Sequence, residues 1–89
     1  MIAIYITTEN MTAEQHAEGR KRLHEAGAPD DAMKLHSVFG EEGKLQVLDI
    51  WDSQEAFDSF LGYLVPILEG LGIKLSAPPT IMPVVDLVQ

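Results

Sequence analysis

Lys44-Leu-Gln-Val-Leu-Asp-Ile-Trp-Asp-Ser-Gln-Glu-Ala-Phe-Asp-Ser-Phe60 changes its periodicity half-way along. Up to Trp51 successive residues alternate between two faces, which predicts a half-buried strand. From Asp52 onward the pattern becomes helical, and Asp52 with Glu55 matches a capping box. Four apolar residues then share one helical stripe: Phe57, Phe60, Leu61 and Leu64. The stretch therefore predicts a strand that passes directly into an amphipathic helix, with Trp51 at the joint.

The flanking sequence predicts four further elements. Residues 2–7 alternate as a β-branched strand, and residues 33–39 form a second strand. Thr12 with Gln15 is a capping box that opens a helix to about residue 26. We expect the second helix to cover residues 53–71 with a kink or break at Pro66, and a last strand, 81–88, to lie at a sheet edge because of its proline, Pro83.

The predicted order is strand, helix, strand, strand, helix, strand, within a single domain that spans residues 1–89. Right-handed crossovers give such a chain an α+β, ferredoxin-like βαββαβ antiparallel sheet with both helices on one face.

The hairpin between the second and third strands sets which side chains share a face. If Glu41 and Glu42 form the turn, His36 pairs with Val47 and Lys34 pairs with Asp49. The helix side of the sheet then takes Ile2, Ile4, Ile6, Leu35, Phe39, Leu48 and Ile50. The opposite side carries Tyr5, Val38, Leu45, Val47, Trp51 and Val85, with no third helix to cover it.

An uncovered apolar sheet face is typical of an interaction surface. A two-fold homodimer whose sheets pack face to face would cover it, and would make a dimeric α+β barrel. The alternative is a monomer with a half-apolar, solvated sheet face.

Composition restricts the classes of partner. Six Lys and Arg against fourteen Asp and Glu give a net charge of -8, which disfavours nucleic acid and anionic membrane surfaces. The apolar run 61–68 is too short to span a bilayer. The N-terminus lacks a basic signal region, and there is no cysteine for disulfides, so we expect a soluble, cytoplasmic protein.

One set of residues could carry chemistry on the face that a dimer would enclose. There His36 would act as a general base, with Asp49 fixing its tautomer. Trp51 and Tyr5 would be flat walls for an aromatic ligand, and Thr7, Val38 and Val47 would complete the binding site.

A purely structural role for these residues is also open. In that case Asp49 pairs with Lys34, His36 is a half-buried core histidine, and Trp51 fills the dimer core. His16 and His24 are explained by solvent exposure and the helix dipole, and no metal-ligand spacing occurs, so we expect no metal site.

The segment Val47-Leu-Asp-Ile-Trp-Asp-Ser-Gln-Glu-Ala-Phe57 with Phe60 resembles the dimeric α+β barrel superfamily, in particular its antibiotic-biosynthesis-monooxygenase-like branch. The resemblance implies a cavity between sheet and helices, lined by Trp51. The haem-degrading members have a histidine on the second helix where this chain has Leu61, so haem is not expected. Small uncharacterised members carry a histidine where His36 stands.

The resemblance implies a cofactor-independent monooxygenase-like enzyme that acts on a small aromatic or polyketide-like molecule, in a pocket between the sheet and its dimer partner. The alternatives are a non-catalytic barrel that binds a small ligand and a purely structural dimer.

Overall fold

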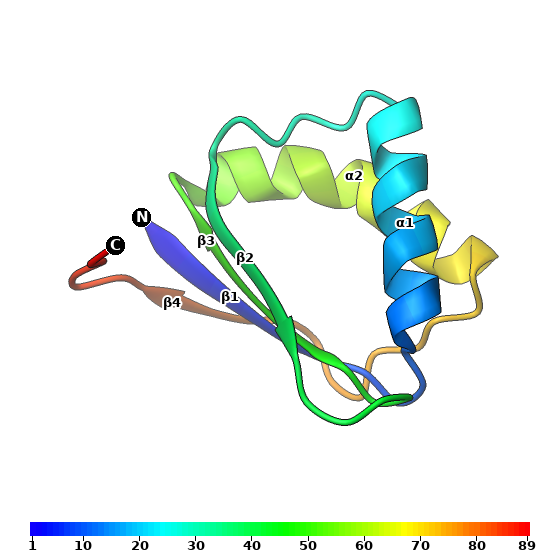
Figure 1. Ribbon diagram of the computed structural model, residues 1–89. Coiled ribbons are helices and arrows are strands. Elements are labelled where there is room, and N and C mark those ends of the chain that lie inside the picture. Colours follow the sequence, from blue (N-terminus) through cyan, green and yellow to red (C-terminus); the bar gives the residue numbers. More distant parts are fainter.

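The computed structural model describes residues 1–89 as a four-stranded antiparallel sheet with two helices on one face (Figure 1). The sheet order is β2-β3-β1-β4, which confirms the predicted ferredoxin-like α+β fold. The elements are β1 (Ile2–Thr7), α1 (Ala13–Glu25), β2 (Met33–Phe39), β3 (Gln46–Trp51), α2 (Gln54–Gly70) and β4 (Thr80–Pro83).

Side-chain caps fix where both helices begin. Thr12 caps α1 in the predicted capping box: its hydroxyl accepts from the Gln15 backbone N–H, and the Gln15 side chain accepts from the Thr12 N–H. The box predicted at Asp52 is wrong, because Ser53 is the N-cap of α2 and accepts from the Ala56 N–H at 3.2 Å.

The two internal prolines have different effects from those expected. Pro66 lies within α2, which nevertheless continues for 17 residues, so the predicted division does not occur. The last strand ends at Pro83 instead of continuing to residue 88. Its edge position is confirmed, because β4 pairs with β1 alone.

The hairpin register differs from the expected one by two positions on β3. Phe39 pairs with Gln46, and His36 pairs with Asp49 instead of Val47. The loop is longer than predicted because Leu45 leaves the β2 ladder, and its N–H donates to the carbonyl of Met11 at 3.1 Å. A bulge between residues 33 and 35 displaces the start of β2.

The pairing of β1 with β3 overturns the predicted faces of β2 and β3. Ile4 lies opposite Asp49 and Ile6 lies opposite Val47, and directly paired residues point to the same side of a sheet. The helix-side face therefore carries the β3 residues that were expected on the open face. The hydrophobic core beneath the helices contains Ile4, Ile6, Met11, Leu45, Val47, Trp51, Phe57, Phe60 and Ile73.

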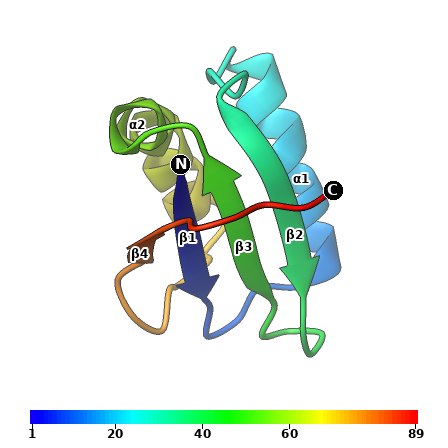
Figure 2. The same ribbon diagram turned by 90° about the vertical axis from the view of Figure 1, so that its left-hand side faces the viewer.

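The opposite side of the sheet, here called the outer face, carries Tyr5, Leu48 and Ile50. The segment after β4 crosses this face, as Figure 2 shows. It leaves Val85 fully exposed and Val88 85% exposed. Neither helix is long and apolar enough to cross a membrane.

Candidate functional site

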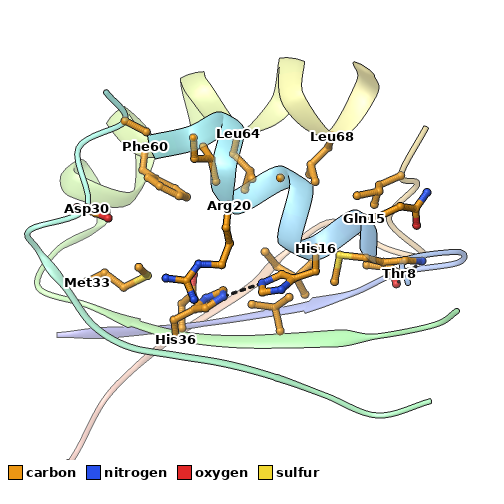
Figure 3. Close-up of a pocket in the computed structure, with 18 of the residues that line it drawn as sticks. Thr8, Gln15, His16, Arg20, Asp30, Met33, His36, Phe60, Leu64 and Leu68 are labelled. Carbon is orange, nitrogen blue, oxygen red and sulfur yellow. Dashed lines mark hydrogen bonds and ion pairs between the residues drawn. The ribbon is translucent and has the colours of Figure 1, made fainter. Parts of the chain in front are cut away.

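A cavity of about 340 Å³ lies between the two helices and the sheet (Figure 3). The resemblance implied a cavity in this place, whereas a pocket between the sheet and a dimer partner stays a prediction. The cavity includes Val47 and Asp49 because β3 turns its odd-numbered side chains toward the helices. Its walls are mainly apolar, with contributions from Leu23, Met33, Phe60, Leu64, Leu68 and Ile73.

Three polar side chains form a continuous hydrogen-bonded series in the cavity wall, here called the Asp–His–His array. Asp49 Oδ1 lies 2.6 Å from His36 Nδ1, and His36 Nε2 lies 3.0 Å from His16 Nε2. The planes of the two imidazole rings are 14° from parallel, with centroids 5.2 Å apart. All three residues line the cavity, so the array connects a buried carboxylate to an open space.

Two neighbouring strands bring Asp49 and His36 together. The residues are directly opposite in the β2–β3 ladder, closer than the diagonal arrangement that the sequence predicted. The alternative pairing of Asp49 with Lys34 is not observed. Lys34 is the extra residue of the bulge, and its ammonium contacts Asp52 at 3.5 Å.

Trp51 is hydrogen-bonded to Asp49, the buried end of the array. Its side chain is completely buried, and its Nε1–H donates to Asp49 Oδ2 at 3.3 Å. The indole packs edge-on against Phe57 and at a tilt against Phe60. Trp51 is not among the residues that line the cavity, so its predicted place on the cavity wall is wrong. Burial of Asp49 is tolerable because both carboxylate oxygens have donors.

The other predicted ligand-binding residues are divided between the two faces. Val47 lines the cavity, whereas Val38 packs against the core beside it. Tyr5 and Thr7 point to the outer face: the Tyr5 hydroxyl donates to Gln46 Oε1, and Thr7 Oγ1 accepts from Ser76 Oγ at 2.7 Å. The structure therefore does not bring Tyr5 and Thr7 to the cavity.

His16 was missed by the sequence interpretation, which explained it by solvent exposure. It occupies the face of α1 that also carries Gly19, Arg20 and Leu23, at the spacing of one helical stripe, and all four line the cavity. The spacing of this stripe could have identified His16 as a cavity residue. A helix face that contains glycine and arginine, however, lacks the apolar pattern that predicts a buried face. Burial, together with the nearby charges of His36 and Arg20, lowers the pKa of His16 below 6.5, against the opposing effect of Asp49.

The array has one consistent neutral hydrogen-bond pattern. His36 donates its Nδ1–H to the carboxylate, which leaves His36 Nε2 as the acceptor for the His16 Nε2–H. A proton gained by the pair can be shared across the Nε2–Nε2 contact and is balanced by Asp49. No group of three or more His, Cys, Asp or Glu side chains is placed to hold a metal ion.

No family model and no curated protein matches the chain. Solved structures do resemble it over its whole length. A proposed antibiotic biosynthesis monooxygenase from Deinococcus radiodurans is 22% identical with a TM-score of 0.63, and covers 100% of this chain and 97% of its own. A second, from Chloroflexus aurantiacus, is 14% identical with a TM-score of 0.65, covering 100% and 98%.

A third, from Nitrosomonas europaea, is 9% identical with a TM-score of 0.61, covering 97% of this chain and all of its own. At these identities the likeness concerns the fold. The chain shares its ferredoxin-like α+β fold with these three structures, in agreement with the fold that the segment around Trp51 implied.

Proposed function

We propose that the cavity binds a small, largely apolar molecule, aromatic or polyketide-like, and that the Asp–His–His array removes a proton from it. The observation that carries the proposal is the array itself, two hydrogen-bonded histidines backed by a buried carboxylate in the wall of an apolar cavity. An imidazole changes charge between pH 5 and 8, which suits a general base near neutrality.

The proposed reaction is an oxygenation that needs no bound cofactor, by analogy with the names of the structural relatives. The free Nδ1 of His16 accepts a proton from an acidic methylene while the His16 Nε2–H passes to His36 Nε2. The resulting carbanion is the electron-rich species that reacts with dioxygen. Formation of a carbonyl from the methylene uses one oxygen atom, and the second leaves as water with the two substrate hydrogens. Asp49 holds His36 in the required tautomer throughout.

Assembly as a homodimer is part of the proposal. Leu48 and Tyr5 occupy the outer face, and the terminal Val85 and Val88 project from the segment that crosses it. Apolar side chains so exposed are covered at an interface in many oligomers. The cavity lies on the other side of the sheet, so a partner is not needed to form its walls.

Anthrone, a tricyclic aromatic ketone with an acidic methylene, is a suitable test substrate. Oxygen uptake and anthraquinone formation measure turnover. We expect His36→Gln to lower the rate by about 10²–10⁴-fold, because the imidazole that receives the proton through His16 is lost. We expect Asp49→Asn to lower it less, because the base remains but its tautomer is no longer fixed.

Arg22→Gln is the control, since Arg22 lies on the same helix as His16 but outside the cavity and the array. It should leave turnover unchanged. If His36→Gln and Asp49→Asn bind and turn over anthrone like the parent, the base assignment is wrong, and the non-catalytic ligand-binding barrel becomes the better description.

A further inference from the structure

Arg20 is an unpaired cation at the edge of the cavity. It lies one helical turn after His16 on α1, and Figure 3 shows its side chain descending from the helix toward His36. It forms no salt bridge and no side-chain hydrogen bond. Arg22, two residues later on the same helix, is instead paired with Glu18 at 3.0 Å.

The Arg20 side chain is exposed at the cavity edge and stays unpaired although the chain is acidic. The protein has six Lys and Arg against fourteen Asp and Glu, a net charge of -8, yet no carboxylate satisfies Arg20. Two acidic residues line the cavity. The two carboxylate oxygens of Asp49 are bonded to His36 and Trp51, and Asp30 forms no salt bridge with Arg20. The donors of Arg20 therefore remain available to a molecule in the cavity.

The walls and the cation together define a ligand with two parts. Leu64, Leu68 and Phe60 of α2 offer an apolar surface, and the Arg20 side chain extends from α1 toward His36 with five N–H donors in a planar fork. A guanidinium binds carboxylate and similar planar anions through two parallel hydrogen bonds.

We propose that the cavity selects an apolar, aromatic-sized anion, a carboxylate or the conjugate base of an acidic phenol or enol, and that Arg20 is the residue that determines this selectivity. The inference rests on the proposed function for the cavity as the binding site. It adds that the negative charge of the ligand, present at binding or formed on loss of its proton, is held by Arg20 while the Asp–His–His array contacts the same molecule.

The test compares two isosteric probes, 2-naphthoate and its neutral amide, 2-naphthamide, by isothermal titration calorimetry. Measurement at about pH 8, where an ordinary imidazole is neutral, isolates the guanidinium as the source of preference. We expect the parent protein to bind 2-naphthoate at least about tenfold more tightly than 2-naphthamide. Arg20→Gln should abolish the preference, and Arg20→Lys should retain only part of it, because an ammonium lacks the planar fork.

Arg22→Gln is the matched control, because it removes the same charge from the same helix outside the cavity. It should preserve the preference for 2-naphthoate. Unchanged 2-naphthamide binding by Arg20→Gln would show that this variant keeps its cavity.

Three results would overturn the inference. Equal affinity of the parent for both probes, or a preference that survives Arg20→Gln, removes the role of Arg20 but leaves the cavity as a binding site. Failure of the parent to bind either probe counts against the proposed function as well.

Discussion

The two faces of β3 have the same strand geometry but opposite chemical roles. On the helix side, Val47, Asp49 and Trp51 are all at least 92% buried. On the outer face, Leu48 is only half-buried, whereas Ile50 is 94% buried. The helix side thus holds the one carboxylate of the sheet, and the outer face holds side chains that a partner could cover.

The difference shows that polarity alone does not identify the exposed side of a strand. Asp49 belongs to the core because Trp51 and His36 satisfy its two oxygens. Leu48 and Ile50 are apolar and yet point away from the helices, whereas the charged Asp49 points toward them. A buried hydrogen-bonded carboxylate costs far less than an unpaired one, so a polar network can reverse the expected orientation of a strand.

A charge placed on either side of β3 should have very different consequences. Val47→Asp puts an unpaired carboxylate into the core and should cost more than about 4 kcal/mol of unfolding free energy, enough to unfold the protein. Leu48→Asp puts the same charge on the outer face and should give a folded protein that sediments as a monomer of 9.8 kDa. Circular dichroism and sedimentation velocity check the two outcomes.

A parent protein that already sediments near 9.8 kDa at micromolar concentration would contradict the proposed dimer. A Val47→Asp variant that folds like the parent would contradict the assignment of faces.

A smaller contrast comes from deleting one polar atom on each side of the sheet. Trp51→Phe removes the donor to Asp49 Oδ2 and leaves space beside Phe57, so it should cost about 2–3 kcal/mol in urea unfolding. Tyr5→Phe removes only the hydroxyl bonded to Gln46 on the half-buried outer face and should cost less than about 1 kcal/mol. Equal losses would mean that Trp51 does not sustain a buried network.

Gly19→Ala should affect stability and binding in opposite directions. Alanine favours a helix over glycine by up to about 1 kcal/mol, and its methyl group would meet Leu71 at an ordinary contact distance of 3.5 Å. Thermal unfolding should therefore show a small stabilisation. Because Gly19 also lines the cavity, affinity for 2-naphthoate should fall. A destabilised variant would mean that α1 and α2 cannot accept even this contact.

The smallest expected effect is the contribution of His16 to acid sensitivity. His16 has a lowered pKa in the native state, so the unfolded state binds more protons just below pH 6.5. Stability should consequently fall as the pH drops below 6.5 through the native pKa, with His36, Arg20 and Asp49 as the charged or titratable groups that act on it. Urea unfolding between pH 7 and 5 should show a shallower fall for His16→Gln. The same flattening in His24→Gln would contradict a specific role for His16.

The sequence predicted the elements better than their faces. Alternation and the Thr12 box located β1, β2 and α1, because these signals are local. The hairpin register depended on Leu45 binding Met11, a contact between distant segments that local patterns do not encode. The sequence placed His36 and Asp49 close together, but on the face that a dimer would enclose instead of the helix side. The link from His36 to His16 required knowledge of where α1 crosses the sheet.

The bulge at Lys34 separates two parts of the cavity that lie on one strand. Met33 and His36 are three residues apart, yet both line the cavity, because the extra residue between Met33 and Leu35 restores the side on which Met33 points. Deletion of Lys34 would remove the bulge but leave Met33 opposite Trp51 on the helix side and His36 opposite Asp49. The strand can thus lose this one residue before Leu35 without turning Met33 out of the cavity or moving the proposed base away from Asp49, so relatives of this chain could differ in length here while retaining the same proton chemistry.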